Sequence, residues 1–124
     1  MSSIKVICCS DTPERFSQIV NFDLHLDEME VLETIDQQLG PHYPRDLHNA
    51  AHHEQHGAVT YLQEVHEGGF AVYVGPPDSL EEHFIGPGMM AAFMDDEGPG
   101  HGSKVGPEGV KRTLRVIKGH LPLA

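Results

Sequence analysis

The chain has 124 residues, 39% of them hydrophobic, and a formal net charge of -11 at pH 7 with histidine neutral. This length fits one domain with its own hydrophobic core, and the negative charge disfavours nucleic acid as a partner. No segment approaches the ~20 apolar residues of a membrane-spanning helix, so the sequence predicts no membrane partner.

The N-terminus predicts a cytoplasmic location. Its apolar stretch is only about five residues long, too short for the core of a secretory signal peptide. Cys8 and Cys9 are the only cysteines, and a disulfide between adjacent residues would be strained. Free thiols are typical of a reducing compartment.

Two strands are predicted at the start of the chain. Residues 4–9 form a short apolar run rich in β-formers. In residues 17–26 apolar and polar side chains alternate, which is the period of a half-buried strand.

A helix is predicted over residues 27–39. Asp27 suits the capping position, and Glu30 takes the reciprocal place in a capping box. Gly40 and Pro41 follow as a stop signal. The apolar stripe of this helix consists of Met29, Leu32, Ile35 and Leu39.

A second helix and a hairpin are predicted in the middle of the chain. Pro44 suits the first position of a helix, and Gly57 suits its end. Residues 58–65 and 70–74 have the composition of strands. The four residues between them include two glycines, which favours a hairpin loop.

The last part of the chain begins with a Gly/Pro-rich segment, residues 75–107, with short helical pieces at 80–85 and 89–94 and a loop at 97–106. A basic helix is predicted over residues 107–118. Together these elements predict one α+β domain over residues 1–124, in which a small, mainly antiparallel sheet of about four strands is packed by helices.

A cluster of histidines occupies the predicted second helix. On a helix, His48, His52 and His56 would share one face because they recur every four residues. Such pairs bind Zn²⁺ or another divalent transition metal, and His66 is a candidate further ligand. The alternative is that these histidines are solvated side chains on an exposed helix.

Two partial motifs lead no further. The histidine segment lacks the His-Glu-x-x-His signature of metalloproteases, since no glutamate directly follows the first histidine of a four-residue pair. Cys9 and Arg15 have the spacing of cysteine-based phosphatases, but Asp11 and Glu14 would repel a phosphate there.

The distribution of charge is the strongest functional signal. No lysine or arginine occurs between Arg45 and Lys104, and five of the eight basic residues lie at or after Lys104. A concentrated negative field speeds encounter with a cationic partner. The candidate partner-binding residues are Glu28, Glu30, Glu33, Asp36, Glu64, Glu67, Asp95, Asp96 and Glu97.

The sequence therefore predicts a small acidic interaction protein of the inhibitor, immunity or nucleic-acid-mimic type, without enzymatic activity or a cofactor, that docks on a basic protein surface. The alternative is a metal-binding protein or small metal-dependent enzyme that uses the histidine cluster. A third hypothesis is an assembly subunit, such as a homo-oligomer, whose basic tail reaches a neighbour.

Overall fold

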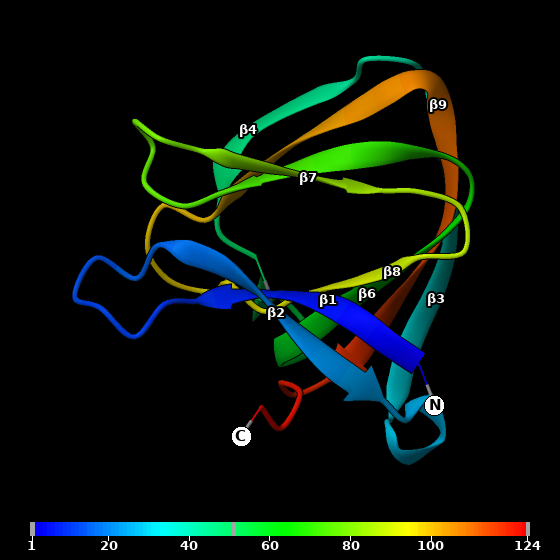
Figure 1. The fold of residues 1–124 in the computed structure, drawn as a ribbon. Coiled ribbons are helices and arrows are strands. Elements are labelled where there is room, and N and C mark those ends of the chain that lie inside the picture. The colour runs from blue at the N-terminus through cyan, green and yellow to red at the C-terminus, as the bar shows by residue number, and fades with distance from the viewer. Residues whose placement is uncertain (1, 51, 124) are drawn as a thin grey trace.

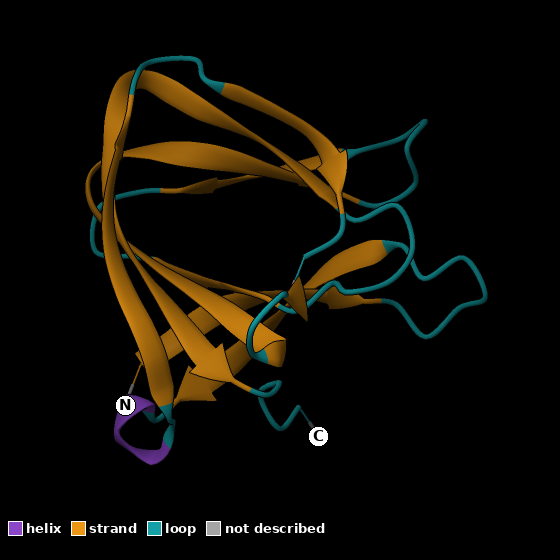
Figure 2. Cartoon of the chain, turned by 180° about the vertical axis from the view of Figure 1, so that it is seen from behind, coloured by secondary structure: helices purple, strands orange, loops and turns teal. Residues whose placement is uncertain are grey.

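The computed structural model describes residues 2–50 and 52–123, without the side chains of Ser2 and His52. The described residues form nine β-strands and one short 3-10 turn, Leu26–Glu28, and contain no α-helix (Figures 1 and 2). The strands are β1 (Ser2–Cys9), β2 (Ser17–Leu24), β3 (Val31–Leu39), β4 (Pro44–His48), β5 (His52–His53), β6 (Gly57–Val74), β7 (Glu81–Ile85), β8 (Met90–Phe93) and β9 (His101–Lys118).

The two longest strands, β6 and β9, organise the sheet. They pair with each other antiparallel along most of their length. The strand order is β2-β1-β8-β6-β9-β3, with β7 on β6 and β4 on β9, and only β1 and β8 pair in parallel. Since β8 pairs with the first half of β6 and β7 with the second half, each long strand contributes to two walls.

The two walls face each other because β6 and β9 bend (Figure 1). One wall contains β2, β1, β8, the first half of β6, the second half of β9 and β3. The other contains β7, the second half of β6, the first half of β9 and β4. The pairing register shifts between Val65 and Glu67 and again between Gly68 and Phe70, and such bulges bend a strand.

Glycine is required at this bend. Gly68 has φ +68° and Gly109 has φ +76°, both in the left-handed region. A Cβ atom on Gly68 would lie 2.0 Å from the carbonyl oxygen of Gly109. The two strands can cross this corner only because no side chain stands between their backbones.

The hydrophobic core has two parts, one on each face of the first wall. Ile7, Val65 and Phe70 belong to the part between the two walls. Val6 and Leu62, which point the other way, belong to the outer part. The C-terminal segment covers this outer part with Leu121, which is 5% exposed.

The predicted α+β class is wrong, because each segment expected to be helical contains a strand and the described residues contain no α-helix. The expected helix over residues 27–39 is a 3-10 turn followed by β3. Val31, Thr34 and Ile35 are β-branched and suit a strand, and β3 pairs with β9 from Val31 to Leu39. The helical stripe in this segment was a coincidence of spacing.

The other helices are corrected in the same way. The segment from Pro44 to Gly57 contains β4, β5 and a turn, and residues 80–85 and 89–94 contain β7 and β8. The basic helix over residues 107–118 is the second half of β9. Both faces of this half-strand are partly buried, with Val110, Arg112 and Val116 on one face and Thr113 and Ile117 on the other.

All four predicted strands fall on strands of the structure, since residues 58–65 and 70–74 both belong to β6. Two loop predictions are wrong in whole or in part. β1 and β2 form an antiparallel hairpin at the expected positions. The predicted hairpin loop at residues 66–69 is instead the bulged middle of β6, and half of the predicted loop at 97–106 belongs to β9. Among the described residues no helix is long and apolar enough to span a bilayer.

Candidate functional site

A cavity of about 300 Å³ lies between the two walls of the bent sheet. Its lining mixes aromatic and aliphatic side chains with several polar and basic ones, a composition typical of small-molecule sites. The lining residues are Gln37, Arg45, His48, Asn49, Ala50, Tyr61, Gln63, Phe70, Phe93, His101, Ser103, Arg112 and Leu114.

Strand register explains why these side chains meet. Residues two apart on a strand face the same side, so Arg112 and Leu114 of β9 both point into the cavity. Pairing then places lining residues opposite one another. The cross-strand pairs are Gln37 with Arg112, Gln63 with Leu114, Tyr61 with Phe93, Arg45 with Ser103 and His48 with His101.

Arg112 is the most unusual group in the cavity wall. It is only 9% exposed, and no carboxylate of a described residue forms an ion pair with it. Its Nε donates a hydrogen bond of 2.9 Å to Oε1 of Gln37, and its Cζ lies 4.8 Å from the centre of the Phe70 ring. Burial, followed by the positive charge of Arg45, lowers the pKa of Arg112 to about 10, so the group stays charged at neutral pH.

Two residues of β4 add basic character near Arg112. Arg45 is exposed, which places it where the cavity opens to solvent. His48 is half-buried, and this burial lowers its pKa below the ordinary value. At neutral pH its ring is uncharged, with Nδ1 2.9 Å from the carbonyl oxygen of Asp46.

Gln63 contributes a hydrogen-bond acceptor that has no donor partner in the described part of the cavity wall. Its Oε1 is buried and has no hydrogen-bond partner among the described residues. A buried carbonyl oxygen in that state costs free energy, and a bound molecule with an N–H or O–H group would satisfy it.

A buried hydrogen-bonded network lies at one end of the cavity. Oδ2 of Asp95 accepts hydrogen bonds from Oγ of Ser17 at 2.8 Å and from Nδ1 of His101 at 2.7 Å. Asp95 is fully buried, and its Oδ1 has no partner in the described part of the chain. The network joins the start of β2, the end of β8 and the start of β9.

The ring of His101 packs against two other rings. Its centroid is 4.6 Å from that of Phe93 and 4.6 Å from that of His48. Gly100 allows the approach to β4, because a Cβ atom there would lie 1.9 Å from the carbonyl oxygen of His48.

The comparisons with known proteins give no guide to this cavity. No family model and no curated protein matches the chain. The function therefore has to be argued from the chemistry of the site.

The structure separates three of the four histidines predicted to bind metal, because the segment that was to align them is not a helix. His48 lines the cavity, and His56 lies in the turn after β5. His66 is in the middle of β6, with Nε2 2.7 Å from Oγ1 of Thr113. The side chain of His52 lies outside the described residues.

A different trio with metal-ligand spacing occurs at Glu33, His53 and His56, whose ligand atoms lie within 4.8 Å of one another. Oε2 of Glu33 is 3.2 Å from Nε2 of His53 and 3.1 Å from Nε2 of His56. However, Nδ1 of His53 accepts hydrogen bonds from the backbone N–H groups of Gln55 and His56. The ring then carries its proton on Nε2, whereas a metal there would need the proton on Nδ1. Metal binding stays a prediction, and this turn would have to rearrange for it.

Several of the predicted partner-binding acids are paired within the chain. Ion pairs join Glu64 to Arg115 at 2.9 Å, Glu67 to Lys111 at 2.9 Å and Glu97 to Arg15 at 3.0 Å. Arg15, whose spacing from Cys9 resembles that of cysteine-based phosphatases, is therefore paired with a carboxylate of the chain itself and is not free to bind a phosphate.

The remaining predicted acids divide into bonded and exposed groups. Asp36 accepts a hydrogen bond from Thr113, Asp95 is buried, and Asp96 has a carboxylate oxygen 3.8 Å from Nε2 of His120. Glu28 and Glu30 are exposed at the turn before β3. Docking on a basic surface stays a prediction, with fewer free carboxylates than the sequence suggested.

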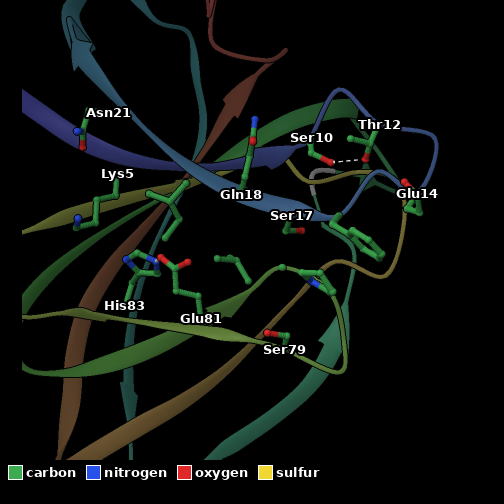
Figure 3. Close-up of a pocket in the computed structure, with 15 residues that line it drawn as sticks. Lys5, Ser10, Thr12, Glu14, Ser17, Gln18, Asn21, Ser79, Glu81 and His83 are labelled. Carbon is green, nitrogen blue, oxygen red and sulfur yellow. Dashed lines mark hydrogen bonds and ion pairs between the residues drawn. The ribbon is translucent and has the colours of Figure 1, made fainter.

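A larger groove of about 720 Å³ is open to solvent between the β1–β2 hairpin and β7 (Figure 3). Its polar side chains include Lys5 and Gln18 on the hairpin and Glu81 and His83 on β7, the last two 2.8 Å apart. Ser17 belongs to this groove and also bonds Asp95, so the network separates the groove from the cavity. No comparably buried charge lines the groove.

Sequence reasoning placed the cavity residues in other roles. The sequence predicts Asp95 on a partner-binding surface and places Arg112 within a basic helix over residues 107–118. The available signal was the alternation of Val110, Arg112, Leu114 and Val116, which predicts a basic residue on an apolar strand face.

Proposed function

We propose that the protein binds a small organic anion, a carboxylate with an apolar or aromatic body, in the cavity between the two walls. The observation that carries this proposal is the buried guanidinium of Arg112, which has no carboxylate partner among the described residues. Arginine donates two parallel hydrogen bonds to a carboxylate. Phe70, Phe93 and Leu114 provide the apolar surface for the rest of the molecule.

Energetics support an anionic ligand. The fall of the Arg112 pKa to about 10 corresponds to about 3 kcal/mol that disfavours the buried charge. A protein rarely keeps such a cost unless the charge has a use. A bound carboxylate would neutralise the guanidinium where water is largely excluded.

The cavity also limits the ligand. A volume of about 300 Å³ is at the small end of ligand pockets. The unpaired Oε1 of Gln63 favours a molecule that carries a hydroxyl or amino group besides its carboxylate. The acidic exterior repels anions at long range, so affinity must come from short-range contacts inside.

Titration calorimetry with benzoate and hydroxybenzoate, with benzamide as the neutral analogue, tests the proposal. We expect both carboxylates to bind and benzamide to bind at least about tenfold more weakly. Arg112→Met removes the charge and is expected to abolish carboxylate binding. Arg112→Lys keeps the charge without the planar fork and is expected to bind with intermediate affinity.

Lys118→Met is the matched control, because Lys118 is an exposed cation on the same strand. It is expected to bind benzoate as the unmodified protein does. Equal affinity of the carboxylates for the Arg112→Met variant and the unmodified protein, or equal affinity of benzoate and benzamide, would contradict the proposal.

Docking of the acidic surface on a basic protein is the second proposal, supported by the exposed Glu28 and Glu30. It requires binding that weakens as salt is added. A cytoplasmic setting is part of both proposals, and the free thiols of Cys8 and Cys9 support it.

A further inference from the structure

We propose that the cavity is also an active site, in which Nε2 of His101 takes a proton from a carbon next to a carbonyl group of the bound carboxylate. The inference rests on the proposed function for its substrate. Its chemistry comes from the Ser17–Asp95–His101 network, which carboxylate binding by Arg112 does not use.

The hydrogen bonds of Asp95 select the tautomer of His101. Oδ2 of Asp95 is 2.7 Å from Nδ1 of His101, and a carboxylate accepts at that distance. Nδ1 therefore carries the proton of the neutral ring. Nε2 is left with its lone pair, which is the form a general base needs.

The position of the ring directs that lone pair. His101 lines the cavity, and Asp95 lies behind it, outside the lining. The Nδ1 edge faces Asp95, while Phe93 and His48 pack around the ring at 4.6 Å. The edge that remains for the cavity is the one that carries Nε2.

The carboxylate of Asp95 lies where it can stabilise the ring after the ring has taken the substrate's proton. Asp95 is fully buried, and its Oδ1 has no partner among the described residues, so its negative charge is poorly compensated. An imidazolium ion beside it neutralises that charge. Ser17 bonds Asp95 and not His101, so it is a positioning residue, and the arrangement differs from the serine–histidine order of a nucleophilic triad.

The proton transfer balances without a further reagent. The C–H bond breaks, its proton goes to Nε2 of His101, and its electron pair forms an enolate. The negative charge develops on the carbonyl oxygen, which the cationic groups Arg45 and Arg112 stabilise. In a substrate whose C=C bond adjoins the deprotonated carbon, the enolate extends to a dienolate, and return of the proton from Nε2 to its far carbon shifts the double bond and completes an isomerisation.

The probe for this chemistry is nitrobenzisoxazole, a neutral aromatic molecule whose ring opens when a base removes its C–H proton. We expect the protein to accelerate ring opening. His101→Gln and Asp95→Asn are each expected to lower the rate by about a hundredfold. His25→Gln, which changes an exposed histidine outside both pockets, is the control and is expected to leave the rate unchanged.

Nitrogen NMR of the unmodified protein tests the same inference without a substitution. We expect the proton on Nδ1 of His101 and a free lone pair on Nε2 at neutral pH. A proton on Nε2 instead, or a rate that His101→Gln leaves unchanged, would overturn the inference.

Benzoate binding and nitrobenzisoxazole turnover are measured on the same sample, so the two proposals can fail separately. Turnover without carboxylate binding would contradict the proposed anion site but support His101 as a general base. Carboxylate binding without turnover would support the anion site but contradict His101 as a general base.

Discussion

At the scale of residues, the cavity keeps basic groups in unlike protonation states. Arg112 stays charged despite burial, because its pKa falls only to about 10. His48 is uncharged at neutral pH, because burial lowers its pKa from an ordinary value already near ~6.5. Both groups line the same cavity, from the paired strands β4 and β9. Arg112 therefore supplies the positive charge for an anionic ligand, while the ring of His48 stays neutral.

The lowered pKa of His48 predicts a loss of stability in acid. Below pH ~6.5 the unfolded chain takes up a proton at His48 that the folded protein does not, so the free energy of unfolding decreases as pH falls. The full contribution is present above that pH. His48→Gln removes the titrating group, and we expect the variant to lose less stability than the unmodified protein between pH ~7 and ~5.

Urea denaturation at the two pH values measures this difference. His25→Gln is the control because the ring of His25 is exposed, and it is expected to follow the unmodified protein. If His48→Gln loses as much stability in acid as the unmodified protein, burial of His48 is not the cause.

At the scale of elements, the corner of β6 and β9 decides whether the cavity exists. The walls come from the same two strands on either side of the bend, and the bend depends on the close approach of Gly68 to Gly109. An unbent pair of strands would leave Arg112 and His101 far apart on an open sheet.

Gly68→Ala is therefore expected to destabilise the fold strongly. The new methyl group would lie 2.0 Å from the carbonyl oxygen of Gly109, and the left-handed φ adds a cost of about 1–2 kcal/mol. Gly57→Ala is the matched control, since Gly57 also has a positive φ, +72°, but nothing within 4 Å of its Cβ position. Denaturant unfolding should show the Gly68 variant less stable than the Gly57 variant by at least about 2 kcal/mol. Equal losses would mean that the close approach at the corner does not limit the bend.

The elements also show which local signals were reliable. β1 and β2 follow from their own alternation, and their hairpin pairs neighbours in sequence. β3 and β9 were mistaken for helices because Ile35 with Leu39, and Val110 with Leu114, fit a helical period as well as a strand. They are strands because they pair with each other across about 80 residues of chain. The local spacing of apolar residues does not reveal such a distant pairing.

At the scale of the whole molecule, charge is segregated between outside and inside. The net charge of -11 comes mostly from exposed carboxylates, while Arg112 lies in the interior. The second half of β9, which the sequence predicted as a basic helix, is a strand within the sheet. There Lys111 pairs with Glu67, Arg115 pairs with Glu64, and Arg112 lines the cavity.

The excess of carboxylates predicts a loss of solubility in mild acid. Ten histidines would offset ten negative charges if all were protonated, and unperturbed histidine titrates near pH ~6.5. We expect light scattering at low salt to rise as pH falls from ~6.5 to ~5, because self-repulsion between molecules decreases. A flat signal over this range would contradict it.

The sequence alone determined an acidic chain with its histidines concentrated in the middle. The apolar run and the alternation at its start determined two strands, since these properties depend on neighbours in sequence. The candidate site depended on tertiary structure. Asp95 and His101 lie in local sequence that fits a solvated surface, and the alternation around Arg112 fits a helix as well as a strand. They became a buried site only when distant strands paired and the glycine corner folded one wall over the other, because burial is a property of the assembled sheet and not of any single segment.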